Sequence, residues 1–271
     1  MNFFYRYDKP GKGVDENEPE KKGIVRYFQM LWRHLRHLTT ATLLYSLVSL
    51  PFLAVYFVLS IYISTSLMGI ETPFQMPMFI TFWIFVFFGS GPCSAGYAYI
   101  LRNCARGEHV FTASDFFENL KDNLKSGLII FAIDLVVLTV LSFAIFFYYN
   151  LYMQGNVLGL IIGVILIFVM ILYTCMHFYL YQILVTFEGK TFNAIKNSLA
   201  LAAAFLPANV AFLIGITAVL VLLFSIFMWA FLAIFLLIIG MVLLRFPIDF
   251  YVARKIKKLF IDKNENDDMT K

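Results

Sequence analysis

Long stretches without any charged residue dominate the pattern of hydrophobic and polar positions along this 271-residue chain. No Asp, Glu, Lys or Arg occurs in 38–70, 72–101 or 197–244, and 126–187 holds only Asp134. A membrane-spanning helix needs about 20 predominantly apolar residues. The first two stretches are therefore long enough for one span each, whereas 126–187 and 197–244 are each long enough for two.

This pattern predicts an all-α fold, a polytopic membrane bundle of six transmembrane helices. The predicted spans are 42–64, 78–101, 127–149, 157–180, 207–226 and 229–250. The last two are separated on length alone, because one helix over 197–244 would extend about 72 Å, far beyond a ~30 Å hydrocarbon core. We expect the chain to turn back near 225–229, unless this stretch forms two half-helices that do not fully cross.

The basic residues predict the orientation of the bundle. All 21 Lys and Arg residues fall into four clusters, at 6–36, 102–125, 190–196 and 245–271. Cytoplasmic segments of membrane proteins are enriched in Lys and Arg. Six spans also place both termini on one side, and both termini are basic. We therefore predict that the N- and C-termini are both cytoplasmic.

Three parts follow along the chain. Residues 1–37 are expected to form a cytoplasmic arm and an interfacial helix, 38–253 the six-helix transmembrane domain, and 254–271 a basic and then polar tail. The composition agrees, with 61% hydrophobic and 14% charged residues, against about 25% charged in soluble domains. Cytoplasmic loops beside anionic lipid explain the net charge of +4, so the lipid bilayer and not a nucleic acid is the expected partner.

Short amphipathic helices are predicted at the cytoplasmic surface ahead of three span pairs. Each carries a Phe, an aliphatic residue three positions later and a Leu four further on, which places all three on one helical face. The instances are Phe28–Leu31–Leu35, Phe117–Leu120–Leu124 and Phe192–Ile195–Leu199. The pattern fits a threefold internal repeat, and it is also typical of any amphipathic helix.

The loop helix between spans two and three, 114–125, is the clearest of these. Ser114 is its expected N-cap, and acidic residues follow in the first turn, where they suit the helix dipole. We predict that its polar face contacts a cytoplasmic partner through Asp115, Asn119, Lys121 and Asn123.

A run of small residues around a proline marks the second predicted span. The residues that define it are Gly89, Gly91, Pro92 and Gly96. Pro92 removes a backbone hydrogen bond and favours a kink, and the small residues allow another helix to approach closely. The segment is either a broken helix whose freed backbone groups line a site, or a kinked helix crossing, and we favour the crossing.

Two polar residues lie inside predicted spans. Asp134 is about two turns into the third span, where a carboxyl group is costly and raises a functional question. It either couples to a proton or a cation, or bridges helices by hydrogen bonds to a neighbouring Tyr or Ser. His177 in span four is a candidate partner, although we favour a hydrogen bond from His177 to a backbone carbonyl. Arg245 and Asp249 are expected to pair on one face of span six, with Arg245 reaching toward the membrane surface.

Catalytic and metal-binding patterns are absent from the sequence. It contains no G-x-S-x-G and no H-E-x-x-H motif, and we expect neither a cofactor nor a metal site, nor an enzyme. The three cysteines have no CxxC spacing and are expected to be small apolar packing residues.

The run from Gly91 to Asn103, followed by Arg106, Glu108 and the segments 114–116 and 121–125, resembles the YesL family of bacterial integral membrane proteins. The resemblance implies a multi-pass protein of the bacterial plasma membrane. It gives no established activity, but implies a genomic association with sugar-uptake ABC transporters and polysaccharide-degrading enzymes.

Two functions are therefore expected. The first is an accessory, assembly or regulatory subunit associated with carbohydrate ABC import, with sugar ABC permease subunits as partners. The alternative is a small autonomous transporter or channel that uses the break in span two and Asp134. A sugar path would need several hydrogen-bonding side chains, which spans four to six largely lack.

Overall fold

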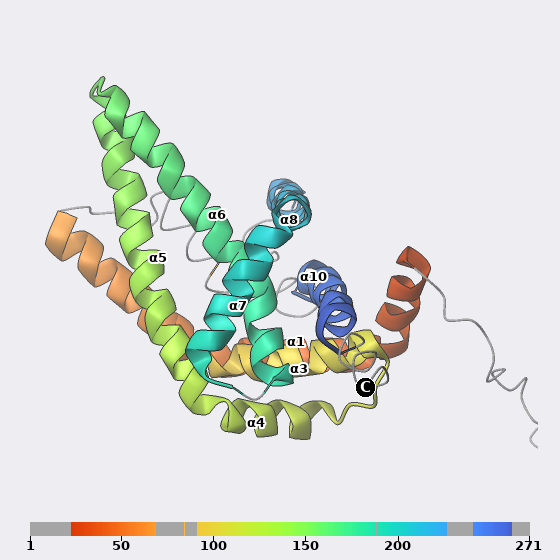
Figure 1. The fold of residues 1–271 in the computed structure, drawn as a ribbon. Coiled ribbons are helices and arrows are strands. Elements are labelled where there is room, and N and C mark those ends of the chain that lie inside the picture. The colour runs from red at the N-terminus through yellow and green to blue at the C-terminus, as the bar shows by residue number, and fades with distance from the viewer. Residues whose placement is uncertain (1–22, 69–83, 85–90, 188, 227–240, 262–271) are drawn as a thin grey trace, which may run out of the picture.

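The computed structural model describes residues 23–68, 84, 91–187, 189–226 and 241–261, and the described residues are almost entirely helical (Figure 1). The helices are α1 (Ile24–Met68), α3 (Pro92–Arg106), α4 (Thr112–Asp122), α5 (Leu124–Met153), α6 (Val157–Thr186), α7 (Thr191–Ala204), α8 (Leu206–Ile226) and α10 (Met241–Ile256), followed by a π-helical turn at Lys257–Ile261. The described residues contain no strand, which agrees with the all-α prediction.

Three helices are long and apolar enough to cross a membrane, over Ile24–Leu59, Leu124–Met153 and Val157–Thr186. The pair α7–α8 passes the same test together but bends by 88° at the break between the helices. These elements coincide with predicted spans one, three, four and five, and they fit a helical membrane protein. Spans two and six lie partly outside the described residues, so the count of six and the predicted side of the termini stay predictions.

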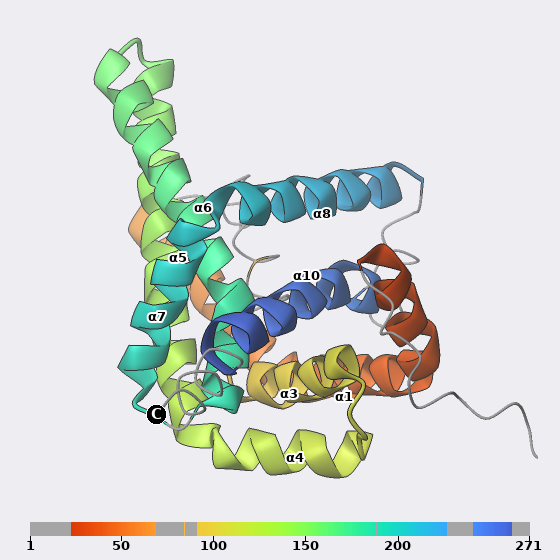
Figure 2. The same ribbon diagram turned by 45° about the vertical axis from the view of Figure 1, so that its right-hand side comes forward.

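The helices α5 and α6 form a long hairpin whose tip projects away from the rest of the protein (Figures 1 and 2). Gly155 has a φ of 88° at the turn, and the Asn156 side chain accepts a hydrogen bond from the Leu158 backbone amide. Gly159 allows α6 to approach the backbone of Tyr148 and Tyr152. Apolar side chains on the first half of α6 are mostly exposed, as expected for a surface in contact with lipid.

The first helix differs from its prediction. A separate interfacial helix before span one was expected, but α1 is continuous over 45 residues and passes through Pro51. Its Thr residues do not interrupt it, because Thr39, Thr40 and Thr42 each donate to the carbonyl oxygen four residues earlier. Such bonds often bend helices, and the first turns of α1 run at an angle to the rest of that helix (Figures 1 and 2).

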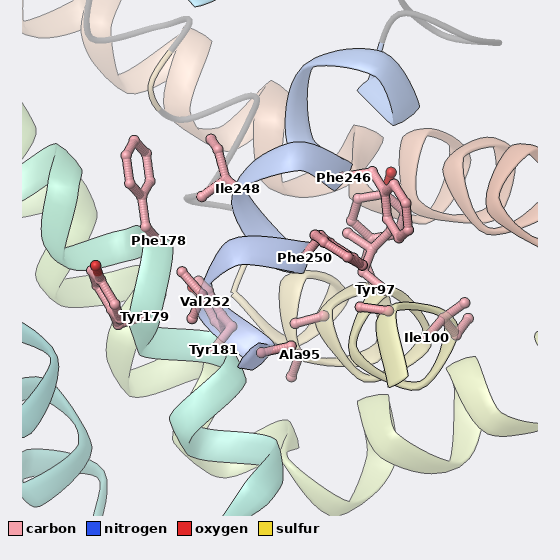
Figure 3. Close-up of a cluster of buried hydrophobic side chains, with 14 of the residues drawn as sticks. Ala95, Tyr97, Ile100, Phe178, Tyr179, Tyr181, Phe246, Ile248, Phe250 and Val252 are labelled. Atoms are coloured by element: carbon pink, nitrogen blue, oxygen red, sulfur yellow. The ribbon is translucent and has the colours of Figure 1, made fainter. Parts of the chain in front are cut away.

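The short helix α3 lies at the centre of the described core and contacts α1, α4, α5, α6 and α10. Thirteen of its 15 residues are buried. Aromatic and aliphatic side chains of α3, α6 and α10 pack together in Figure 3, and those labelled are Ala95, Tyr97, Ile100, Phe178, Tyr179, Tyr181, Phe246, Ile248, Phe250 and Val252. This packing holds three segments together that are far apart in the sequence.

A buried asparagine fixes the bend between α7 and α8. Asn209, in the first turns of α8, donates to the carbonyl oxygen of Ala202 at 3.1 Å and thereby pairs a carbonyl at the end of α7. The same side chain accepts a hydrogen bond from the Tyr179 hydroxyl of α6 at 2.8 Å. The end of a helix leaves carbonyl groups unpaired, so Asn209 completes the break and ties it to α6.

Candidate functional site

The small-residue segment begins a helix. Gly91 has a φ of 56° and is the N-cap of α3, and Pro92 is the first residue of that helix, a favoured position for proline. The left-handed backbone conformation at position 91, from which α3 begins, is one that glycine adopts readily. Gly89 lies outside the described residues.

The same segment packs closely against two neighbouring helices. A Cβ on Gly127 of α5 would lie 2.6 Å from the Pro92 nitrogen, and one on Gly96 would lie 2.6 Å from the carbonyl oxygen of Phe116 in α4. The small residues thus serve close helix packing. The predicted kink involves residues 85–90, which lie outside the described residues, and it stays a prediction.

The surface helix α4 begins earlier than predicted. Its first residue is Thr112 and its N-cap is Phe111, whose backbone amide donates to the Asp115 carboxylate at 2.9 Å. The prediction that Ser114 is the N-cap was therefore wrong. Ser114 lies inside the first turn, and the Asp115 carboxylate accepts from the backbone amide of the actual N-cap, Phe111.

The predicted contact residues of α4 differ in exposure. Lys121 is exposed, but Asp115, Asn119 and Asn123 are half-buried. Asn119 and Asn123 donate to carbonyl oxygens of their own helix. The face that points outward lines a shallow depression and consists of Ala113, Ser114, Phe117, Glu118, Lys121 and Asp122.

Asp134 and His177 meet inside the bundle, each about 1% exposed at the side chain. The Nε2 atom of His177 lies 2.9 Å from Oδ1 of Asp134, and the Tyr173 hydroxyl donates to the same oxygen at 2.5 Å. The Nδ1 atom of His177 lies 3.0 Å from the carbonyl oxygen of Tyr173. The carboxyl group therefore bridges α5 and α6, and His177 makes both the predicted backbone hydrogen bond and the contact with Asp134.

Arg245 and Asp249 form a second buried polar cluster. Their side chains lie 3.4 Å apart on α10, and the Gln182 amide of α6 donates to the Asp249 carboxylate at 2.6 Å. The Arg245 guanidinium lies over the ring of Tyr97, 4.8 Å from its centroid. The pairing was predicted correctly, but the expectation that Arg245 reaches the membrane surface was wrong. Its side chain is 2% exposed, because a carboxylate and an aromatic face both stabilise its charge internally.

The two polar clusters adjoin each other. The ring centroid of Tyr181 of α6 lies 6.4 Å from that of His177, and both residues are close enough to Arg245 to feel its charge. Two buried oxygens here, Asp134 Oδ2 and the Tyr181 hydroxyl, have no hydrogen-bond partner within the described part of the chain. Buried polar groups usually have partners, which makes this region the strongest candidate for chemistry in the membrane domain.

Sequence reasoning missed Tyr173, Tyr181 and Gln182. Tyr173, His177 and Tyr181 are spaced by four, so they lie along one face of α6. That spacing within an otherwise apolar span was the signal that could have found them. Gln182 gave a weaker signal, as a single amide near the end of the span.

Among the residues that the structure describes, neither a reactive thiol nor a metal centre is apparent. The cysteines are buried and unpaired, and burial raises the pKa of the Cys104 thiol to about 12, so it stays protonated at neutral pH. Over the residues with described positions, no group of three or more His, Cys, Asp or Glu is placed to hold a metal ion.

Residues 74–145 match the family described as "Protein of unknown function, DUF624". The matched region includes Gly91 and Pro92, all of α4, and α5 as far as residue 145, and therefore Asp134. No curated protein and no solved structure matches the chain.

Proposed function

We propose that this protein is an accessory subunit of a carbohydrate ABC importer in the bacterial plasma membrane, and that it acts by contacts on the cytoplasmic side. The proposal places both termini in the cytoplasm and the α5–α6 hairpin across the bilayer. The basic clusters support that orientation. The match to DUF624 agrees with the resemblance to the YesL proteins, which are members of that family. The association with carbohydrate import comes from that resemblance.

The observation that carries the proposal is the outward face of α4. Phe117 is 41% exposed and is surrounded by Glu118, Lys121 and Asp122, which are also exposed. An apolar aromatic side chain with charged neighbours is typical of a protein contact, in which the aromatic residue is buried and the charges select the partner. This helix lies at the end of the protein opposite the hairpin tip (Figure 2), which is the end that the basic residues assign to the cytoplasm.

Substitutions on α4 test this proposal. F117D and K121E should reduce copurification of ABC permease subunits at least tenfold, because they remove an apolar contact and reverse a charge. K196E is the matched control, since Lys196 is an exposed lysine on another surface helix, α7. Equal recovery of permease subunits with F117D, K121E and the unmodified protein would contradict the proposal.

The alternative function is a small autonomous transporter, favoured by one observation. Asp134, Tyr173 and His177 place an ionisable cluster within helices that are long and apolar enough to cross a membrane. Such clusters mark ion and proton pathways in many membrane proteins. Uptake into proteoliposomes that contain the purified protein alone, abolished by D134N, would support this alternative and argue against a purely accessory role.

A further inference from the structure

The hydrogen bonds of His177 determine where its protons lie. The Nδ1 atom lies 3.0 Å from the carbonyl oxygen of Tyr173. A carbonyl oxygen only accepts hydrogen bonds, so Nδ1 must carry a hydrogen. If the ring is neutral, Nε2 then has a lone pair and no hydrogen.

The second contact of the ring therefore requires an additional proton. Nε2 lies 2.9 Å from Oδ1 of Asp134. A neutral ring and an ionised carboxylate would place two lone pairs against each other at that distance. We propose that Asp134 and His177 form a proton-binding site that holds one proton between the carboxyl oxygen and the ring nitrogen. The proton lies either on Nε2, beside a carboxylate, or on Oδ1, beside a neutral ring.

The second buried aspartate differs in its contacts. Asp249 receives hydrogen bonds from the Gln182 amide and lies 3.4 Å from Nε of Arg245, and both of these groups are donors. Neither contact requires a proton on Asp249, and an ionised Asp249 would balance the charge of Arg245. Asp134 instead faces a ring nitrogen that can accept a proton, which makes it the carboxyl group that binds one.

Charge balance supports the same assignment. The ionisable groups nearest the pair are Tyr173 and Tyr181 of α6 and Arg245 of α10. Arg245 is in turn in contact with Asp249 of α10, Tyr45 of α1 and Tyr97 of α3. With Arg245 and Asp249 both charged and the tyrosines neutral, one proton on the pair makes the whole region electrically neutral. Uncompensated charge in an apolar interior is strongly unfavourable.

Loss of this proton would affect the contact between α5 and α6. The site would then carry a net negative charge at side chains about 1% exposed, and its two facing lone pairs would repel each other. The carboxyl group and the ring would have to move apart or admit water. Proton release is thus coupled to the α5–α6 contact. The proton passes to a water molecule that enters the site. Asp134 Oδ2 and the Tyr181 hydroxyl, which have no partner within the described region, can form hydrogen bonds with that water.

Two spectroscopic measurements on the full-length protein in lipid bilayers test the site. Nitrogen-15 NMR of histidine-labelled protein reports the protonation of both ring nitrogens, and loss of one signal set in H177Q identifies His177 among the four histidines. Infrared spectroscopy reports protonated carboxyl groups. We expect either a doubly protonated His177 ring or a protonated Asp134 carboxyl at neutral pH. D134N should remove whichever signal is seen and leave a neutral ring.

A neutral His177 ring with unprotonated Nε2, together with no protonated carboxyl band, would overturn the proposal. If D134N does not fold, H177F gives a second test, because a phenyl ring donates no hydrogen bond and Asp134 must then hold the proton itself and show the carboxyl band. An H177F protein without that band would contradict the proposal. T174V, which removes only a hydroxyl bonded to its own helix, should keep the wild-type signals. These measurements do not depend on any partner protein. The proton-binding site can therefore be disproved while the proposed accessory role through α4 stands.

Discussion

Gly127 of α5 lies against Pro92 of α3 so closely that a Cβ built on the glycine would be 2.6 Å from both the nitrogen and the α-carbon of the proline. Gly91 makes the same contact from the other side, since its own Cβ would be 2.9 Å from the Gly127 carbonyl oxygen. The start of the central helix α3 is therefore seated directly on the backbone of α5, and both glycines are needed for that approach.

A larger side chain at position 127 should destabilise the protein. We expect G127V to lower the free energy of unfolding by about 1–3 kcal/mol, because the neighbour is backbone and cannot move aside cheaply. Thermal unfolding in detergent measures the change. G163A on α6 is the control, since a Cβ there meets nothing within 4 Å and alanine favours the helix. Equal melting temperatures for the two variants would show that the close contact is not formed.

Loss of the Asn209 side chain should weaken the bend between α7 and α8. N209A leaves the Tyr179 hydroxyl and the Ala202 carbonyl without their partner, which costs about 1–3 kcal/mol for each buried group left unpaired. Y179F should cost less, and the double variant N209A/Y179F should cost less than the two single changes together. Strict additivity of the two changes in a double-mutant cycle would mean that the side chains do not interact.

Removal of Arg245 should be among the most destabilising single changes. R245M leaves Asp249 as a buried carboxylate without its cation, and breaking such a pair costs about 3–5 kcal/mol. R245M/D249N should recover part of that loss because no unpaired charge remains. R36M, at an exposed arginine of α1, is the control. If R245M melts at the temperature of R36M, Arg245 is not the buried cation described here.

The Cys104 thiol should resist alkylation in the folded protein. Burial raises its pKa from the ordinary value of 9.0 to about 12, so the reactive thiolate is scarce at pH 8. The pKa of the thiol is higher in the folded protein than in the unfolded chain. The protonated thiol therefore contributes its full stabilisation below pH 9, and this contribution is lost as the pH rises from about 9 to about 12. S114C, on the exposed face of α4, should react with a maleimide at least a hundredfold faster than Cys104. Comparable rates would place Cys104 at the surface.

Long apolar segments were the most predictable part of this fold. Predicted spans 127–149 and 157–180 correspond to α5 and α6, because apolar length alone determines a spanning helix. The boundary of α1 was not predictable in the same way, since the polar Thr39 and Thr40 satisfy their hydroxyl groups on their own helix and do not end it. Local hydrogen bonding of this kind leaves no periodic signal.

Of the candidate site, Asp134 and His177 were predictable from the sequence, whereas Tyr173, Tyr181 and Gln182 and the contacts among them were not. A single aspartate within a long apolar stretch is visible in the sequence, and His177 was its predicted candidate partner. The sequence could not show that Arg245 turns inward, because an arginine near the end of a span reaches the surface in most proteins. Asp249 lies beside the guanidinium on the same helix, but only the packing of α3 against α10 brings the face of Tyr97 there and keeps Arg245 inside the protein.

The most direct test of the proposed function is purification of the tagged, unmodified protein from its native host in mild detergent, with quantitative mass spectrometry of the proteins that accompany it. We predict permease subunits of a carbohydrate ABC importer in amounts comparable to the tagged protein. Purification of the protein without such subunits, under conditions that keep the importer itself intact, would contradict the accessory role.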